Sequence, residues 1–165
     1  MAQITFGGRP AHTSGDLPKI GTKAPEFSLV KKDFKESSLS DYIGKKVILN
    51  IFPSVDTSVC STSVRKFNEK AASLENTVVL CISKDLPLAQ ARFCGAEGID
   101  DVIMLSGFRN NTYSTDYGIE LLDEGFKGLN ARAVIVLDEQ GMVKYSELVS
   151  EISHEPNYEA ALNAL

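Results

Sequence analysis

The sequence is poor in the residues that build metal centres and disulfide frameworks: it has three cysteines, two histidines and no tryptophan among 165 residues. No Cys-x-x-Cys pair occurs, and neither the spacing nor the supply of ligands suits a zinc site. We therefore expect no bound metal or prosthetic group. An odd number of cysteines, in what we expect to be a reducing compartment, also argues against a structural disulfide framework.

Long apolar stretches and clusters of basic residues are absent as well. The longest apolar runs span five or six residues, far short of a transmembrane helix. The first residues, Met1–Thr5, show neither the basic nor the apolar region of a signal peptide, which predicts a cytoplasmic protein. Net charge is −5 and the basic residues are dispersed, so we expect no nucleic-acid or membrane partner.

What is present is the composition of an ordinary globular protein. Hydrophobic residues make up 43% of the chain and charged residues 24%, and the length suits one domain with a sizeable core. We expect residues 1–165 to form that single domain.

Apolar runs predict a central β-α-β-α-β arrangement. Buried strands are expected at 47–52, 78–82 and 102–105, with helices at 60–74 and 88–94 between them. Such crossovers make the strands parallel. Pro87 suits the first turn of the second helix, and Gly95 is expected to end it.

Shorter elements surround this centre. They are an N-terminal hairpin from Ile4 to Thr13, a strand at 27–30, a short helix at 110–117, a hairpin of 133–137 with 142–149, and a final helix at 156–165. Parallel strands in the middle, a terminal hairpin and flanking helices indicate a thioredoxin-like α/β sandwich with an N-terminal β-hairpin extension.

The most informative feature is the octet Pro53-Ser-Val-Asp-Thr-Ser-Val-Cys60, which connects the strand at 47–52 to the following helix. It places the Cys60 thiol in the first helical turn, with Thr57 or Ser58 as N-cap. Unpaired backbone N–H groups and the positive end of the helix dipole both favour a thiolate there. The thiolate is the nucleophilic form of cysteine.

A second interpretation of Cys60 is purely structural. The residue shares the apolar face of its helix with Val64, Phe67, Ala71 and Leu74, so it could be a small buried hydrophobe. The two hydroxyl residues and the strand-ending proline beside it favour a reactive thiol.

The pattern Pro-x-x-x-Thr-x-x-Cys resembles the peroxidatic motif of peroxiredoxins, and nearly the whole chain shares the likeness. The N-terminal hairpin and the second cysteine resemble in particular the bacterial thiol peroxidases, which are atypical two-cysteine peroxiredoxins. The segments that carry the resemblance are Gly21–Phe27, Pro53–Cys60, Cys94 at 34 positions after Cys60, Tyr117-Gly118, and Ala131–Val136 with Asp138-Glu139.

The resemblance implies a role for each residue of the motif. Cys60 would attack the peroxide, with Thr57 as hydrogen-bonding partner and Pro53 shielding the sulfur. Arg132 would supply the permanent cation, and Cys94 would resolve the sulfenic acid as an intramolecular disulfide. Residue by residue, simpler roles stay open: helix capping for Thr57, strand termination for Pro53, a solvated surface for Arg132 and a buried thiol for Cys94.

The same resemblance implies the partners. The substrates would be hydrogen peroxide and alkyl hydroperoxides, and the electrons would come from thioredoxin, ultimately from NADPH through thioredoxin reductase. It further implies a homodimer. Cys81, within an apolar strand, is expected to be an unreactive core thiol.

Three rival functions remain to be weighed. A cysteine phosphatase would need Cys-x5-Arg, whereas Arg65 comes one residue early and no glycine frees the loop to wrap an anion. A thiol–disulfide oxidoreductase would need Cys-x-x-Cys. A non-turnover peroxide sensor or holdase could use the same cysteine pair, and catalytic turnover would distinguish the enzyme from it.

Overall fold

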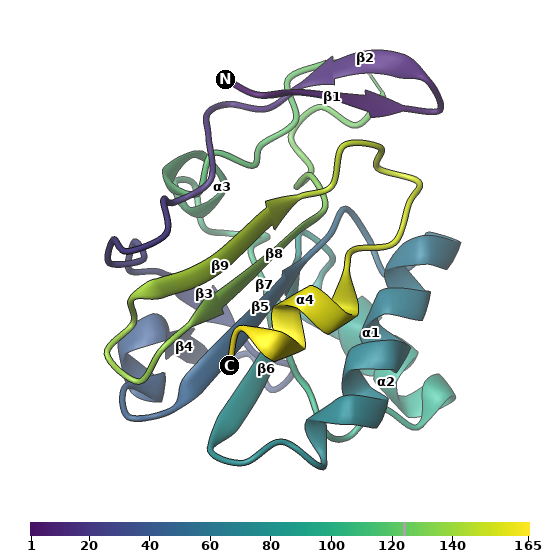
Figure 1. The fold of residues 1–165 in the computed structure, drawn as a ribbon. Helices are drawn as coiled ribbons and strands as arrows, with labels where there is room; N and C mark the ends of the chain where they lie inside the picture. Colours follow the sequence, from purple (N-terminus) through teal and green to yellow (C-terminus); the bar gives the residue numbers. More distant parts are fainter. Residues whose placement is uncertain (124) are drawn as a thin grey trace.

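The computed structural model describes residues 1–123 and 125–165 (Figure 1). The strands are β1 Gln3–Phe6, β2 Arg9–His12, β3 Ser28–Val30, β4 Glu36–Ser38, β5 Lys46–Ile51, β6 Thr77–Ser83, β7 Ile103–Ser106, β8 Ala133–Leu137 and β9 Val143–Leu148. The helices are η1 Leu39–Tyr42 (3-10), α1 Ser58–Ala71, α2 Pro87–Glu97, α3 Tyr113–Asp116 and α4 Tyr158–Asn163.

The centre of the fold is a seven-stranded mixed sheet in the order β4-β3-β7-β6-β5-β8-β9. Strands β5, β6 and β7 are parallel and are joined through α1 and α2, as the sequence predicted. Strand β8 runs antiparallel to β5 and forms the predicted hairpin with β9. These findings confirm the α/β sandwich with its separate N-terminal hairpin, β1-β2.

The strands divide their side chains between two cores because successive residues point to opposite faces of a sheet. In β5, Leu49 and Ile51 belong to one core, whereas Ile48 belongs to the other. The second core is completed by residues of α1, α2 and α4, which cover that face of the sheet (Figure 1). Cys60, Cys81 and Cys94 all lie in this helix-side core.

The two helices α1 and α2 differ from the prediction in where they begin and end. Helix α1 begins at Ser58 rather than at residue 60 and ends at Ala71. Helix α2 continues through Gly95, which was expected to end it, and stops at Gly98. Gly98 has a φ of 66°, and this left-handed conformation terminates the helix at little steric cost for glycine. Gly95 lies within the helical turn that follows Cys94.

Other short elements also differ from the prediction. Helix α3 occupies only part of the expected range, because the Asn110 side chain accepts hydrogen bonds from the backbone N–H groups of Thr112 and Tyr113 before the helix begins. Helix α4 is shorter than predicted at both ends, and Asn157 caps it by accepting from Ala160 N–H. Strand β4 and the η1 turn had no predicted counterpart.

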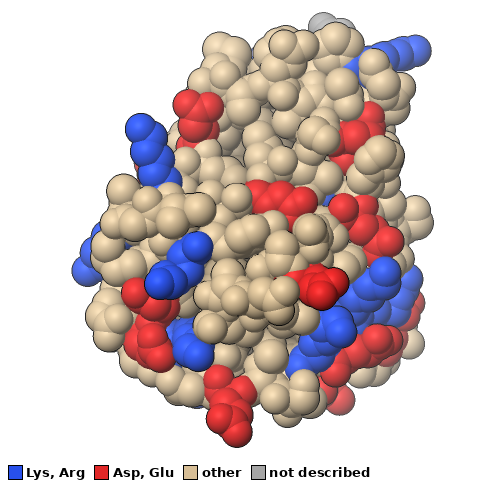
Figure 2. Space-filling view, in the orientation of Figure 1, with Lys and Arg blue, Asp and Glu red and all other residues tan. Residues whose placement is uncertain are grey.

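The hairpin β1-β2 lies at one end of the sheet, beside the segment that leads from β9 to α4 (Figure 1). On the molecular face of Figure 2, acidic and basic side chains are interspersed. Among the residues described, no helix combines the length and the hydrophobicity needed to cross a membrane.

Gly118 closes α3 in a position that only glycine fits. Its φ is 69°, and a Cβ built there would lie 2.3 Å from the carbonyl oxygen of Asp16. We predict that Gly118→Ala lowers the free energy of unfolding by more than about 2 kcal/mol. Gly95→Ala, in open space within α2, should instead raise it by up to about 1 kcal/mol. Urea unfolding of both variants measures this, and equal effects would contradict the steric argument.

Candidate active site

Cys60 is the third residue of α1, which follows the loop that leaves β5, and its side chain is fully buried. Thr57 occupies the N-cap position, but its side chain makes no capping hydrogen bond. Its hydroxyl donates to the carbonyl oxygen of Ser54 at 3.2 Å. The prediction of the N-cap position was therefore right, whereas the hydroxyl stabilises the preceding loop rather than the helix.

Arg132 comes directly before β8 and approaches Cys60 from the neighbouring strand. The register pairs Ala133 with Ile51, so Arg132 lies at the edge of the sheet where β5 ends. Its Nη2 donates to Cys60 Sγ at 3.2 Å, and its Nε donates to the carbonyl oxygen of Ile152 at 2.9 Å. The third nitrogen, Nη1, is buried and has no hydrogen-bond partner among the described residues.

The guanidinium of Arg132 is only 1% exposed, and a buried cation requires a compensating negative group. No carboxylate lies within ion-pair distance of Arg132 among residues 1–123 and 125–165. Its hydrogen-bond acceptors are a backbone carbonyl and the Cys60 sulfur. The sulfur is the one acceptor of the two that can carry a negative charge, so a thiolate at Cys60 would compensate the guanidinium.

A pocket of about 210 Å³ opens beside Arg132, and the fully buried Cys60 is not among the residues that line it. The buried Pro53 and the half-buried Thr57 line one side. The other lining residues come from distant parts of the chain, and with Arg132 they are Phe6, Ser58, Val59, Phe126, Ile152 and Ser153. The structure therefore brings Pro53, Thr57, Cys60 and Arg132 together at one place.

Asp85 anchors the loop between Pro53 and Thr57, a function that the sequence did not reveal. Its carboxylate accepts from Ser54 Oγ at 2.7 Å, from Val55 N–H at 2.8 Å and from Ser83 Oγ at 2.5 Å. The donors lie 2 to 31 positions away from Asp85 in sequence. The contacts that span about 30 positions exist only once β5 and β6 pair. The pattern Ser-x-Asp after a buried strand is the one local signal that could have indicated such an anchor.

Arg65, the alternative cation, is not at the sulfur. Its guanidinium contacts Glu97 at 3.3 Å and the Thr62 hydroxyl at 3.2 Å on a partly exposed surface. The structure thus selects Arg132 rather than Arg65 as the partner of Cys60.

Cys94 lies near the end of α2 and is 4% exposed. It forms no disulfide with Cys60 or Cys81, and all three thiols are free. Burial raises the pKa of the Cys94 thiol, an effect that the charge of Lys32 opposes and that of Asp100 reinforces. In this arrangement Cys94 is protonated at neutral pH and is a poor nucleophile.

Cys81 points from β6 into the helix-side core. Burial raises its pKa to about 12, although Asn50 Nδ2 approaches its sulfur at 3.6 Å. The same Asn50 amide contacts Ser63 Oγ, which in turn donates to the Cys60 carbonyl. Cys81 therefore lies in the core, where the sequence placed it, and burial favours its protonated form.

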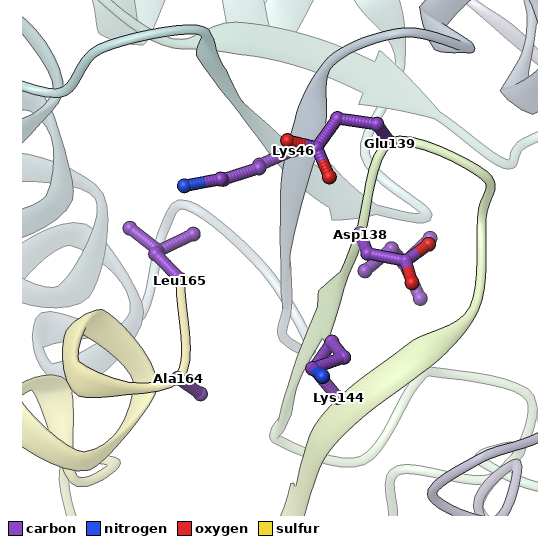
Figure 3. Close-up of a pocket in the computed structure, with 7 residues that line it drawn as sticks. Lys46, Asp138, Glu139, Lys144, Ala164 and Leu165 are labelled. Carbon is purple, nitrogen blue, oxygen red and sulfur yellow. The ribbon is translucent and has the colours of Figure 1, made fainter.

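A larger hollow of about 420 Å³ lies between the β8-β9 turn and the end of α4 (Figure 3). Lys46, at the start of β5, lines it together with Asp138, Glu139 and Lys144. Because Cys60 follows the opposite end of β5, this hollow is separated from the thiol by the length of the strand, on the order of 15 Å. In the described part of the chain, no cluster of three His, Cys, Asp or Glu side chains could hold a metal ion.

Comparison with known proteins places this chain in a family. A family model described as Redoxin matches residues 19–162. A thiol peroxidase from Corynebacterium glutamicum is 59% identical over 165 residues, which cover 100% of this chain and 99% of that protein. The chain belongs to the redoxin family. These matches also confirm the resemblance to thiol peroxidases and support an enzyme of the peroxiredoxin type over a sensor or holdase.

Solved structures agree with this assignment to the redoxins. A peroxiredoxin-like protein from Aquifex aeolicus is similar with a TM-score of 0.93 and 37% identity, covering 99% of this chain and 95% of that one. A thiol peroxidase from Chromobacterium violaceum has the same fold, with a TM-score of 0.90 at 21% identity over 98% of this chain and 93% of the other. The thioredoxin-like fold predicted from the sequence is thereby confirmed.

The raised pKa of Cys81 predicts a loss of stability in alkaline solution. An unfolded thiol ionises above pH ~8.5 whereas the folded Cys81 stays protonated to about pH 12, so the folded state binds more protons between these values and stability falls as pH rises. By pH 10 this contributes a loss on the order of 2 kcal/mol.

Cys81→Ala should remove this contribution. Urea unfolding at pH 7 and pH 10 should therefore show the variant losing less stability than the wild type across that interval. The raised pKa of Cys94 also lowers stability as the pH rises, but Cys94 is present in both proteins, so its contribution cancels in the comparison. Equal losses in the two proteins would show that Cys81 ionises normally in the folded state.

Proposed function

We propose that this redoxin reduces hydroperoxides at Cys60 and resolves the product through Cys94. The observation that carries the proposal is the contact between Arg132 Nη2 and the Cys60 sulfur; the Arg132 side chain also lines the pocket, and its Nη1 is buried without a hydrogen-bond partner among the described residues. One guanidinium nitrogen stabilises the thiolate. Its neighbour is free to donate to an oxygen of the peroxide.

In the first step the Cys60 thiolate attacks one peroxide oxygen and the O–O bond breaks. The sulfur becomes a sulfenic acid, and the departing alkoxide or hydroxide takes a proton to leave as alcohol or water. Negative charge moves from sulfur to the leaving oxygen during this step. Arg132 contacts the sulfur and lines the pocket, so it can stabilise the charge at both positions.

In the second step the Cys94 sulfur attacks the sulfenic sulfur, water leaves, and a Cys60–Cys94 disulfide forms. A disulfide needs Cα atoms within roughly 7 Å and correctly aimed Cβ atoms. Cys60 begins α1 and Cys94 lies within α2, so we propose that both helix ends loosen before the bond forms. Gly95 weakens the last turn of α2 because glycine has a low helix propensity, and exposure to water would return the raised pKa of Cys94 toward its ordinary value.

The remaining features follow from the resemblance to thiol peroxidases. The electron donor is thioredoxin, reduced by NADPH through thioredoxin reductase, and the substrates are alkyl hydroperoxides and hydrogen peroxide. The enzyme is cytoplasmic, and residues 1–165 form one domain. The resemblance also implies a homodimer, and the exposed apolar side chains of Leu86, Leu88 and Phe108 are available for an interface.

A series of cysteine variants tests the proposal. With thioredoxin, thioredoxin reductase and NADPH, Cys60→Ser should abolish peroxide-dependent NADPH oxidation, because a hydroxyl is far less acidic than a thiol. Cys81→Ser should retain most of the activity. Cys94→Ser should consume one peroxide per chain and then stall as a sulfenic acid.

Mass spectrometry of the peroxide-treated wild type identifies the bond itself. We expect linked peptides containing Cys60 and Cys94 from a single chain. Retained activity in Cys60→Ser would refute Cys60 as the nucleophile. A Cys60–Cys60 or Cys60–Cys81 link in place of Cys60–Cys94 would refute the resolving mechanism while leaving the first step intact.

The role of Arg132 is tested by Arg132→Lys, which keeps a positive charge but loses the planar set of donors. Loss of one guanidinium contact to the developing oxyanion should lower the second-order rate with peroxide on the order of 10²-fold. The matched control is Arg65→Lys, since Arg65 lies five residues beyond Cys60 yet contacts Glu97. Stopped-flow oxidation of the two reduced variants compares them, and a larger effect at Arg65 would show that the wrong cation was assigned.

A further inference from the structure

Glu151 is partly exposed, yet its carboxylate accepts hydrogen bonds from two separate segments of the chain. Its two oxygens accept five hydrogen bonds, from Thr5 Oγ1 at 2.7 Å, Gly7 N–H at 2.9 Å, Gly8 N–H at 3.0 Å, and Ser153 N–H at 3.1 Å and Oγ at 2.5 Å. These bonds lower the pKa of the carboxyl well below its usual range. Glu151 is therefore a carboxylate throughout the neutral pH range.

The contacts join two segments that are far apart in sequence. Thr5, Gly7 and Gly8 belong to the turn region of the β1-β2 hairpin, and Ser153 lies in the segment between β9 and α4. Two backbone bonds reinforce the junction, Thr5 N–H to Ser150 O at 2.7 Å and Ile152 N–H to Thr5 O at 2.9 Å. Gly7 and Gly8 both have positive φ, which turns their N–H groups toward the carboxylate.

Both segments form walls of the pocket beside Arg132. Phe6 precedes the glycine pair, lines the pocket, and packs on Phe126 with ring centroids 4.4 Å apart. Ile152, next to Glu151, also lines the pocket, and its carbonyl holds Arg132 Nε at 2.9 Å. The Glu151 side chain thus holds in place both the apolar wall at Phe6 and the Ile152 carbonyl that orients Arg132.

We propose that Glu151 is a positioning residue for peroxide reduction, and that it acts by holding the hairpin turn and the 150–153 segment as one wall of the pocket. The proposal rests on the assignment of Cys60 and Arg132 as the reacting pair. A small peroxide needs the Arg132 side of the pocket, whereas a bulky apolar hydroperoxide also contacts Phe6 and Phe126. Release of the wall therefore affects bulky substrates more than hydrogen peroxide.

The test compares the second-order rate of Cys60 oxidation by cumene hydroperoxide with that by hydrogen peroxide. Glu151→Gln keeps the shape but replaces one acceptor oxygen with a donor amide, so several of the five bonds are lost. We expect the ratio of the cumene hydroperoxide rate to the hydrogen peroxide rate to fall about tenfold. A change of this size corresponds to the loss of one well-packed aromatic contact. Glu159→Gln, an exposed change on α4, is the control and should leave the ratio unchanged.

A second variant separates positioning from general destabilisation. Phe6→Ala removes the wall directly, so its ratio should also fall, and the double variant with Glu151→Gln should show no further fall in the ratio. A loss of folding would lower both rates together. If Glu151→Gln does not fold, Thr5→Val removes one of the five bonds and should shift the ratio in the same direction.

An unchanged ratio in a folded Glu151→Gln or Thr5→Val variant overturns the proposal. Additive losses in the double variant with Phe6→Ala overturn it as well, because Glu151 would then act elsewhere than through the wall. Failure of the underlying assignment has a different signature: Cys60→Ser would still react with peroxide, whatever the behaviour of Glu151→Gln.

Discussion

The buried guanidinium of Arg132 is the constraint on which the site depends. A permanent cation that is 1% exposed costs several kcal/mol unless a negative group neutralises it, and none of the described carboxylates pairs with it. The Cys60 sulfur, 3.2 Å away, is the acceptor that can do so. A thiolate at Cys60 would place a compensating charge next to the buried guanidinium.

The sheet explains why these two groups meet, although 72 residues separate them. Strands β5, β6 and β7 are parallel, so their carboxyl ends share one edge, where α/β proteins commonly place their sites. Strand β8 runs the opposite way beside β5, so its first residues lie at that same edge. The loop carrying Cys60 leaves β5 there, Arg132 enters β8 there, and Asp85 follows β6 there.

The local part of this site could be predicted from the sequence. Pro53, Thr57 and Cys60 stand in one octet between a strand and a helix, and their order alone indicates a thiol at a helix N-terminus. Arg132 is different, because nothing local distinguishes it from four other arginines. The resemblance to a known family identified it, and the strand register supplies the physical reason.

The groups that support the site could not be predicted, because their contacts are long-range. Asp85 binds Ser54, 31 positions away, and Glu151 binds Thr5, 146 positions away. An acidic residue in a loop gives no sign of which backbone N–H groups will surround it. The misplaced helix end at Gly95 has a related cause: glycine permits a left-handed turn but does not require one, and in α2 that turn occurs at Gly98.

The two thiols proposed to react in turn differ in their surroundings. Cys60 is buried with its sulfur 3.2 Å from the Arg132 guanidinium, a cation that would stabilise a thiolate. Cys94 is buried in the same core without a cation in hydrogen-bond contact, and burial raises its pKa. While the fold is closed, Cys94 therefore stays protonated and does not compete with Cys60 for peroxide. Opening of the α2 end would expose Cys94 to water and increase its nucleophilicity, so the order of the two steps follows from the folded state that each requires.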